Sequence, residues 1–569
     1  MVVLHRVAPQ RGLLRVLLHQ LRSQRTDGQT ARHVLRPRGA RPERSRTGHR
    51  SLRPEGLSRL GLWDNAVAKL VKKRGAESGG AGPRDWPSLE GLKRLSKVND
   101  ESLQDLRQDA LACLAAALGA IDPERLVGSA LRVRGRTLET PGRSFRLQGH
   151  RIHLLAVGKA AVPMARAALG KLPIASGILA SNRPPNDIPM DRIRSFVGSH
   201  PLPDEGSLAA GEAALQLVDR LGRDNLLLVL VSGGASAMFE ASPIPLEDLR
   251  LAYGSLLRSG LPIRDVNEVR KGLSLVKGGR LAARAAARGA TVVGLIVSDI
   301  VGNPIEDIGS GPTAIESSRG ARAMQVLRTH GLWEEMPPTV RTRLEAAPAE
   351  PKLEQSVRRR VHNLIVADLS LACRAAMKEA RRRGYRVRLW STSVEGEARK
   401  VGPSFSSHAL EWAPDAAAIG VVAGGETTVR VVGGGRGGRN QELVLSAAPA
   451  IEGRHAVLLS CGTDGIDGNT EAAGAIVDGD TLARARTLGL DPEDFLRENN
   501  SYAFFRALGD LIVTGPTGTN VADLLILLAR RRDRRGRGPP SRSGRRPGTS
   551  KTRRNPRSRP PARRLRVHG

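Results

Sequence analysis

Short, nearly continuous apolar runs recur along the middle of the chain. They cover residues 152–157 (IHLLAV), 225–231 (NLLLVLV), 291–297 (TVVGLIV) and 361–367 (VHNLIVA). Runs of this length that alternate with amphipathic stretches are typical of parallel strands buried on both faces. Each run is followed by glycine or small polar residues, and open α/β sheets bind their ligands at this end of the strands. The pattern predicts a mostly parallel α/β architecture.

Helical spacing begins near Ser102, where apolar residues recur every three or four positions and Ser102 is available as the cap. Asp122 and Pro123 predict a second helix start, because aspartate is a favoured cap and proline fits the first helical position. A Pro- and Glu-rich stretch over residues 337–355 marks the expected boundary between two α/β units.

Residues 421–445 (VVAGGETTVRVVGGGRGGRNQELVL) predict a strand, a second strand, a Gly-rich turn and the start of a helix. Glycines allow close backbone approach to an anion, a helix start adds partial positive charge, and guanidinium groups donate two hydrogen bonds at once. We therefore expect a phosphate site made by Arg436, Gly437, Gly438, Arg439 and Asn440.

The formal net charge of +34 comes from the ends of the chain. Residues 1–100 hold 22 Lys/Arg against 8 Asp/Glu, and residues 530–569 hold 17 against 1, so the middle is close to neutral. Both ends are predicted to be disordered, because they cannot bury enough apolar surface. The N-terminal end fits a transit peptide, a nucleic-acid-binding arm or a misassigned start codon, and these readings stay open.

Three scattered cysteines (Cys113, Cys373 and Cys461) without a CxxC pair indicate neither a disulfide framework nor a zinc site. No apolar run reaches the roughly 20 residues that a membrane span needs. These features favour a cytoplasmic protein.

Several charged residues lie at predicted strand ends or beside glycine turns. Lys159 follows a strand and a glycine, which places its ammonium group either at the mouth of the sheet or in solvent. The Ser232-Gly233-Gly234 turn could present N–H groups to an anion or be a plain tight turn. A third cluster, NEVRKGLSLVKGG, holds Asn267, Arg270, Lys271 and Lys277, and only the group as a whole suggests anion binding.

The carboxylates Asp299, Glu426 and Asp464 also follow predicted strands, where they could hold Mg²⁺ together with substrate phosphates. Asp467 and Glu471 are more simply explained as turn residues. Glycines 433, 435 and 438 satisfy a dinucleotide-binding pattern, but the loop carries Arg436 and lacks the acidic residue expected about 20 positions later. No P-loop occurs in the chain.

Nine blocks in order resemble the glycerate 2-kinases with a C-terminal MOFRL domain. They are AVGKAAVPMA, SHPLPDEGSLAAGEAAL, VSGGASAMF, NEVRKGLSLVKGGRLA, VSDIVGNPIEDIGSGPT, GGETTV, GGRGGRNQEL, GTDGIDGNTEAAGA and TGPTGTNVADL. The resemblance covers about residues 103–529. It implies a Rossmann-like, mostly parallel α/β/α domain over residues 101–345 and a smaller MOFRL-type α/β domain over residues 346–529, flanked by basic ends at 1–100 and 530–569.

The resemblance also implies transfer of the γ-phosphoryl group of ATP to D-glycerate, giving 2-phosphoglycerate, with Mg²⁺ and an active site in the interdomain cleft. The family's active-site lysine falls on Lys159 and its functional arginine on Arg439. Two positions depart from the family pattern: Ala235 replaces a glycine, and Gly272 replaces a histidine.

Two other functions compete with the kinase. One is an NAD(P)H-dependent hydroxypyruvate reductase, a label that this family has sometimes carried. The other is a nucleic-acid-binding protein that uses its basic ends, against which stand the 3% aromatic content and the near-neutral middle. The partners expected for the kinase are small molecules, and a homodimer is possible.

Overall fold

The structure is a computed structural model that describes residues 100–531, except 148, 150, 186, 187, 189, 190, 316–319 and 347–352. The disorder predicted for residues 1–100 and 530–569 falls almost entirely outside the described residues.

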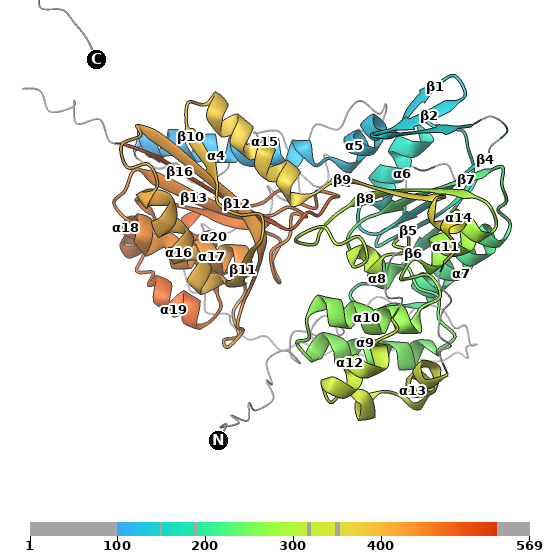
Figure 1. The fold of residues 1–569 in the computed structure, drawn as a ribbon. Helices are drawn as coiled ribbons and strands as arrows, with labels where there is room; N and C mark the ends of the chain where they lie inside the picture. The colour runs from blue at the N-terminus through green and yellow to red at the C-terminus, as the bar shows by residue number, and fades with distance from the viewer. Residues whose placement is uncertain are drawn as a thin grey trace, which may run out of the picture. The chain divides into compact units, whose positions relative to one another are not determined.

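A parallel sheet forms the centre of the first lobe (Figure 1). Its strand order is β6-β5-β4-β7-β8-β9 and every neighbouring pair is parallel. The strands are β4 (Arg151–Val157), β5 (Ile174–Ser181), β6 (Ile193–Val197), β7 (Asn225–Val231), β8 (Thr291–Val297) and β9 (Val361–Ala367). The apolar runs therefore predicted four of these strands correctly.

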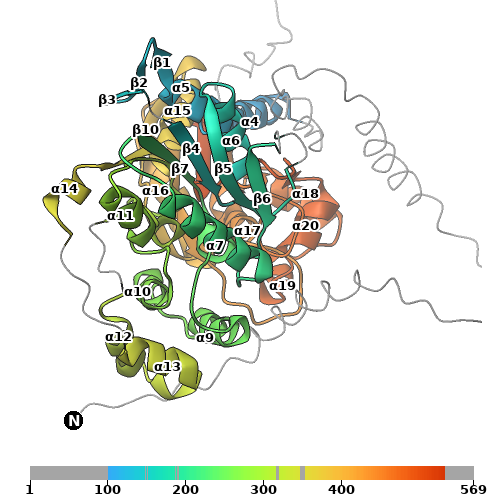
Figure 2. The ribbon, with the colours of Figure 1, turned by 90° about the vertical axis from the view of Figure 1, so that its right-hand side faces the viewer.

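Helices cover both faces of this sheet because successive strand residues point to opposite sides. Leu154 packs into one apolar core with Met164 of α6 (Ala161–Leu169), and Leu155 packs into another with Ala214 of α7 (Glu205–Asp219). Figure 2 shows α6 and α7 beside the strands. Other helices of this part are α5 (Pro123–Ala130), α8 (Ala235–Met238), α11 (Arg280–Ala287), α14 (Gln355–Arg358) and η1 (Ile308–Ser310).

A separate group of helices carries the basic cluster that the sequence singled out. It contains α9 (Leu246–Arg258), α10 (Ile263–Leu273), α12 (Ala323–Thr329), η2 (Trp333–Glu335) and α13 (Pro338–Glu345), which share an apolar core of their own. A small antiparallel sheet is formed by β1 (Arg132–Arg134), β2 (Thr137–Thr140) and β3 (Arg143–Arg146).

The second lobe is built on a mixed sheet of strand order β10-β12-β16-β13-β14-β15, with β11 also paired to β12. The strands are β10 (Arg386–Leu389), β11 (Val394–Glu397), β12 (Ala418–Thr428), β13 (Ala456–Gly462), β14 (Gly474–Asp478), β15 (Leu511–Ile512) and β16 (Asp523–Arg530). One apolar core joins this sheet to α16 (Ala398–Glu411), α17 (Arg439–Ile451), α18 (Thr481–Thr487), α19 (Pro492–Arg497) and α20 (Ser501–Leu508). Helix α15 (Leu369–Arg382) packs on the other face.

Two elements lie with the other lobe than the one expected from a domain boundary at residue 346. Helix α4 (Glu101–Ala120) packs against α15 and the second sheet, and its buried Arg107 pairs with Asp478 and Asp510. Strand β9 lies in the first sheet beside β8. Arg107 is held by two buried carboxylates, and β9 forms the edge strand of the first sheet through its pairing with β8, so tertiary pairing decided both placements.

Two local predictions also need correction. The cap of α4 is Asp100, whose carboxylate accepts a 2.9 Å hydrogen bond from the Ser102 N–H, so Ser102 lies inside the helix. The second strand expected after Gly-Gly-Glu does not form, because β12 continues to Thr428 and the chain then becomes irregular. By contrast, Asp122 caps α5 with Pro123 at its start, as predicted.

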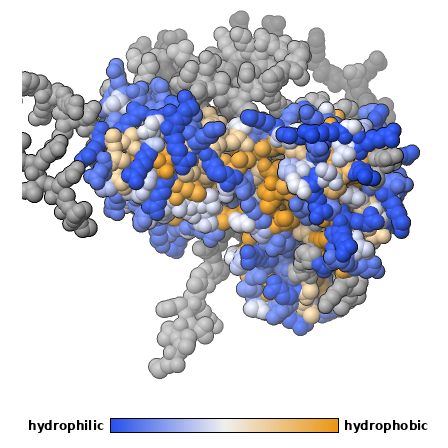
Figure 3. All heavy atoms as spheres, turned by 45° about the horizontal axis from the view of Figure 1, so that its top comes forward, coloured by the Kyte–Doolittle hydropathy of each residue, from blue (hydrophilic) through white to orange (hydrophobic). Residues whose placement is uncertain are grey.

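The described surface is mostly hydrophilic on the face drawn in Figure 3. Among the described residues of 100–531, no helix is both long enough and apolar enough to cross a bilayer. Cys113, Cys373 and Cys461 are buried free thiols.

Candidate active site

The turn after β4 holds Lys159 through its backbone. The Lys159 N–H donates to the Gly233 carbonyl at 2.9 Å, and the Ala160 N–H donates to the Ser232 hydroxyl at 3.0 Å. Gly158 has φ +110°, and a Cβ at this position would lie 2.4 Å from the Ser232 carbonyl oxygen. Ser232 is 1% exposed and already hydrogen-bonded, so the Ser-Gly-Gly turn positions the lysine instead of offering its hydroxyl to a ligand.

The side chain of Lys159 reaches the second lobe. Its Nζ lies 3.4 Å from Oδ2 of Asp464, which follows β13. The side chains are 30% and 21% exposed, so both remain accessible to a ligand. A strand-end lysine and a strand-end aspartate from different sheets therefore meet at one place.

Asp299 follows β8 and joins this group. Its carboxylate packs on Gly233, where an added Cβ would lie 2.1 Å from Oδ2. The pKa of Asp299 is raised to about 6, chiefly by burial and also by the charges of Glu426 and Asp464, whereas a backbone hydrogen bond and Lys159 oppose the shift. At neutral pH Asp299 is thus largely ionised and still more basic than an ordinary carboxylate.

His200 is a neighbour of Lys159 that the sequence reasoning did not single out. A Cβ on Gly234 would lie 3.3 Å from Cγ of Lys159 and 3.5 Å from Cδ2 of His200, so these side chains flank the same turn. The surrounding protein and the charges of Lys159 and Arg270 lower the pKa of His200 to about 4, which makes it neutral at pH 7. The signal that could have found His200 is its place in the block SHPLPDEGSLAAGEAAL, although a single histidine before a proline suggests no chemistry by itself.

Arg439 begins α17 and is fully engaged. Its Nε and Nη2 donate to Asp523 at 2.5 and 3.1 Å, and its Nη1 donates to Glu426 at 2.7 Å. Burial disfavours the guanidinium charge, but Asp523 and Glu426 outweigh it and raise the pKa of Arg439. The structure links Arg439 to the group around Lys159 through Glu426, whose charge acts on Asp299.

The Gly-rich loop before Arg439 packs onto protein and not around an open cradle. Added Cβ atoms on Gly437 and Gly438 would lie 2.3 Å from the Ser501 hydroxyl and 2.3 Å from Cγ of Asp467. Asp467 also accepts hydrogen bonds from the N–H groups of Asn440 and Gln441, at 3.1 and 2.9 Å. The N-terminus of α17 is therefore capped by a carboxylate of the chain itself.

The other residues predicted for that loop are also engaged elsewhere. Asn440 is 2% exposed, and its side chain bonds Asp467 and Ser460. Arg436 is exposed, pairs with Glu471 at 2.9 Å and lies 4.6 Å from the ring centroid of Tyr502. The sequence signal was correct in showing that the backbone needs glycine, but close packing against the loop before α20 supplies the reason.

The three cationic side chains of the basic cluster on and after α10 have different partners. Lys271 is 3% exposed and lies 3.4 Å from Asp307. Lys277, which follows the helix, is 1% exposed and pairs with Glu240. Arg270 is 6% exposed and lies 5.3 Å above the ring of Tyr253.

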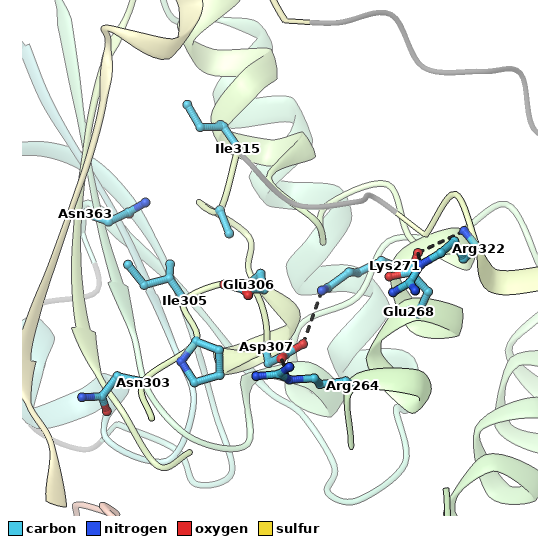
Figure 4. A pocket seen from close by; sticks show the side chains of 12 residues that line it. Arg264, Glu268, Lys271, Asn303, Ile305, Glu306, Asp307, Ile315, Arg322 and Asn363 are labelled. Atoms are coloured by element: carbon cyan, nitrogen blue, oxygen red, sulfur yellow. Dashed lines mark hydrogen bonds and ion pairs between the residues drawn. The ribbon is translucent and has the colours of Figure 1, made fainter. Parts of the chain in front are cut away.

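A cavity of about 600 Å³ lies beside α10 and the loop after β8. Figure 4 shows Lys271 and Arg264 directed toward Asp307, and Arg322 next to Glu268. Its lining is Arg264, Glu268, Lys271, Asn303, Pro304, Ile305, Glu306, Asp307, Ala314, Ile315, Arg322 and Asn363. Acidic and basic side chains are paired within it, so the cavity has no strong preference for either charge.

The two departures from the family pattern are accommodated. Ala235 begins α8, and the left-handed φ of +82° falls on Gly234 instead. Gly272 is required by packing, since an added Cβ would lie 2.8 Å from the Cβ of Ala323 and 2.9 Å from Cδ2 of Leu344. A histidine at position 272 would not fit this interface.

The carboxylates predicted to bind metal do not form a preformed cage. No group of three or more His, Cys, Asp or Glu suited to a metal ion occurs among the described residues. Asp464 nevertheless lies close enough to Asp299 for its charge to raise the pKa of the Asp299 carboxylate. Because Mg²⁺ needs only one or two carboxylates together with phosphates and water, this pair fits such an ion.

Comparisons with known proteins place this geometry in a family. Residues 109–345 match the family model described as a domain of unknown function, DUF4147, and residues 419–523 match the MOFRL family. The glycerate 2-kinase of Pyrococcus horikoshii is 38% identical over 434 residues, which cover 74% of this chain and 97% of that protein. The D-glycerate 2-kinase of Thermotoga maritima is 39% identical over 422 residues, which cover 71% and 99%.

A putative hydroxypyruvate reductase of Agrobacterium vitis is 38% identical, with coverage of 73% of this chain and 92% of that protein. The crystal structure of the glycerate kinase from Thermotoga maritima superposes with a TM-score of 0.65 at 35% identity, covering 75% of this chain and all of that chain. The chain therefore belongs to the family of glycerate kinases that combine a DUF4147 domain with a MOFRL domain.

Proposed function

We propose that this chain transfers the γ-phosphoryl group of ATP to D-glycerate and releases 2-phosphoglycerate and ADP. The observation that carries the proposal is the meeting of Lys159, Asp299 and Asp464 from two sheets at one place. The names of the relatives support it, since glycerate kinases match this chain over nearly their whole length.

The chemistry follows from the positions of these groups. Phosphoryl transfer needs alignment and charge neutralisation more than covalent help. Lys159 carries a positive charge on a rigid turn, where it neutralises the migrating phosphoryl group. Asp299 accepts the proton of the glycerate hydroxyl as the new O–P bond forms and the bond from the γ-phosphorus to the bridging oxygen of ADP breaks.

Arg439 acts from the second lobe. Its hydrogen bonds to Asp523 and Glu426 fix the orientation of Glu426, whose charge acts on Asp299. Asp464 would hold a Mg²⁺ ion that arrives with the nucleotide, and the ion would neutralise part of the phosphate charge while Asp299 serves as the base. A homodimer and a cytoplasmic location remain part of this proposal.

The competing reductase reaction is separated from the kinase reaction by one comparison on the full-length protein. Release of ADP that depends on both ATP and D-glycerate supports the kinase. Oxidation of NADH with hydroxypyruvate, together with no ADP release, would overturn the proposal. No observation on the described residues favours the nucleic-acid-binding reading, since the basic ends lie outside them.

A further inference from the structure

The guanidinium group of Arg270 stands out among the buried charges of the first lobe. The residue is 6% exposed, and its Nε is buried without a hydrogen-bond partner. Within the described residues no ion pair or hydrogen bond reaches this side chain, and its contact is the face of the Tyr253 ring at 5.3 Å. A buried charge without a partner is costly to the fold, so it calls for an explanation.

The neighbours of Arg270 do not neutralise it. The charge of Glu240 acts on Arg270, but Glu240 already pairs with Lys277 and accepts a 2.7 Å hydrogen bond from the Tyr253 hydroxyl. The pKa of Tyr253 is raised well above its usual value, chiefly by burial, so the phenol is neutral. The group formed by Arg270, Lys277, Glu240 and Tyr253 therefore carries one uncompensated positive charge.

Arg270 lies on the side of α10 that faces the Lys159 turn. Asn267, three residues earlier and thus on the same helical face, accepts a 3.0 Å hydrogen bond from the Ser310 hydroxyl. The Ser310 hydroxyl lies 2.8 Å from that of Ser236, two residues after Gly234. This chain of contacts ties α10 to the turn that positions Lys159.

His200 completes the connection. It flanks Gly234 together with Lys159, and the charges of Lys159 and Arg270 both act on it. Because His200 is neutral at pH 7, it adds no positive charge beside Lys159 and Arg270, and its ring can donate or accept a hydrogen bond.

We infer that Arg270 binds the carboxylate of the acceptor substrate and sets the specificity for a hydroxy acid. The inference rests on the proposed kinase function. A guanidinium pairs with a carboxylate through two parallel hydrogen bonds. Because only 6% of Arg270 is exposed, we expect it to bind a small anion with a single charge. A polyphosphate is larger and brings several charges and a metal ion, so it fits this position less well.

With the substrate carboxylate on Arg270, Lys159 remains for the phosphoryl group. Arg439 already holds Asp523 and Glu426, so its capacity for a further carboxylate is largely used. Lys159 lies at the mouth of the sheet beside Asp464 and Asp299, where the phosphoryl group is transferred. Arg270 is left to hold the end of the substrate that does not react.

The test compares D-glycerate with its uncharged amide, glyceramide, in the full-length protein and in Arg270→Met. Methionine keeps most of the apolar stem and removes the charge. We expect KM for D-glycerate to rise about 10- to 100-fold, which corresponds to the loss of a charge-assisted interaction, with KM for ATP unchanged. The wild-type preference for glycerate over glyceramide should disappear in the variant.

Arg270→Lys, which keeps a charge but loses the planar fork, should restore part of that preference. Arg258→Met, at an exposed arginine on the neighbouring helix α9, serves as the matched control and should leave both KM values unchanged. Because no carboxylate among the described residues pairs with Arg270, we also expect Arg270→Met to unfold at the same or a higher temperature than the wild type.

Two results would overturn the inference. One is an unchanged preference for glycerate over glyceramide in Arg270→Met, and the other is an effect on KM for ATP alone, which would assign Arg270 to the nucleotide. Both are distinct from failure of the proposed function, since a wild-type protein that never phosphorylates D-glycerate would show no preference to lose.

Discussion

Arg270 and Arg439 come from different lobes and look equivalent in the sequence, because each lies in a basic, glycine-containing block. The structure gives them opposite surroundings. Arg439 is paired with Asp523 and Glu426, whereas Arg270 is buried over Tyr253 and pairs with no carboxylate in the part of the chain that the structure describes.

The difference indicates what each lobe contributes. The first lobe supplies the cations Arg270 and Lys159, the carboxylate Asp299 and a neutral histidine. The second lobe supplies carboxylates, Asp464 and Glu426, and uses its arginine to hold them in place. A charged residue that has no partner in the fold is the one for which a ligand has to be sought.

The largest expected effect of a single substitution is that of Asp299→Asn. It removes the proposed base without changing the size of the side chain, and kcat should fall about 10³-fold. In the wild type, kcat/KM should decline as the pH falls below about 6, because Asp299 then becomes protonated. A pH profile of the residual activity in the variant should lack this decline, and a profile with the decline intact would exclude Asp299 as the base.

The raised pKa of Asp299 also makes the stability of the protein depend on pH. Because the pKa of Asp299 is raised from 3.8 to about 6 in the fold, the folded protein binds more protons than the unfolded chain in this interval. The contribution of Asp299 to the free energy of unfolding should therefore decrease from pH 4 to about 6 and stay constant above. Asp299→Asn should lack this component in urea titrations at a series of pH values.

Arg439→Gln sharpens the comparison with Arg270→Met. We expect kcat to fall at least about 100-fold, because Glu426 and Asp523 lose the guanidinium that positions them in the site. Unlike Arg270→Met, this variant should also lose about 1–3 kcal/mol of stability, since Asp523 is left buried without its partner. Equal stabilities of the two variants in chemical denaturation would contradict the distinction drawn between these arginines.

Arg436→Ala should have the smallest effect. Arg436 is exposed and makes a surface pair with Glu471, so its loss should change stability by less than about 1 kcal/mol and kcat by less than about threefold. A large decrease in kcat would instead bring back the phosphate site predicted for the Gly-rich loop. Kinetics at saturating ATP and D-glycerate decide between the two outcomes.

The sequence predicted the elements whose signal is local. The runs at 225–231 and 291–297 coincide with β7 and β8, because a strand buried on both faces must be apolar throughout. The position of Lys159 at a strand end could be predicted for the same reason. Placing α4 on the second sheet could not, since it depends on Arg107 meeting Asp478 and Asp510 across long stretches of chain.

Partner assignments within the site were equally out of reach. From the sequence alone, Arg270, Lys271 and Lys277 are equally good candidates for binding an anion. In the structure Lys271 pairs with Asp307 and Lys277 pairs with Glu240. The glycines before Arg439 indicated close backbone approach, but a ligand and another part of the chain impose the same requirement. In this loop the approaching group is Asp467 or the segment around Ser501.

The central claim is that the two lobes act on one reaction through Lys159 and Asp464. A double-mutant cycle with Lys159→Ala, Asp464→Ala and the combined variant tests it through kcat/KM for D-glycerate. We predict that the combined variant is no slower than the slower single variant, with a coupling of at least about 1 kcal/mol. Losses that simply add would show that the two side chains act independently and would contradict this account.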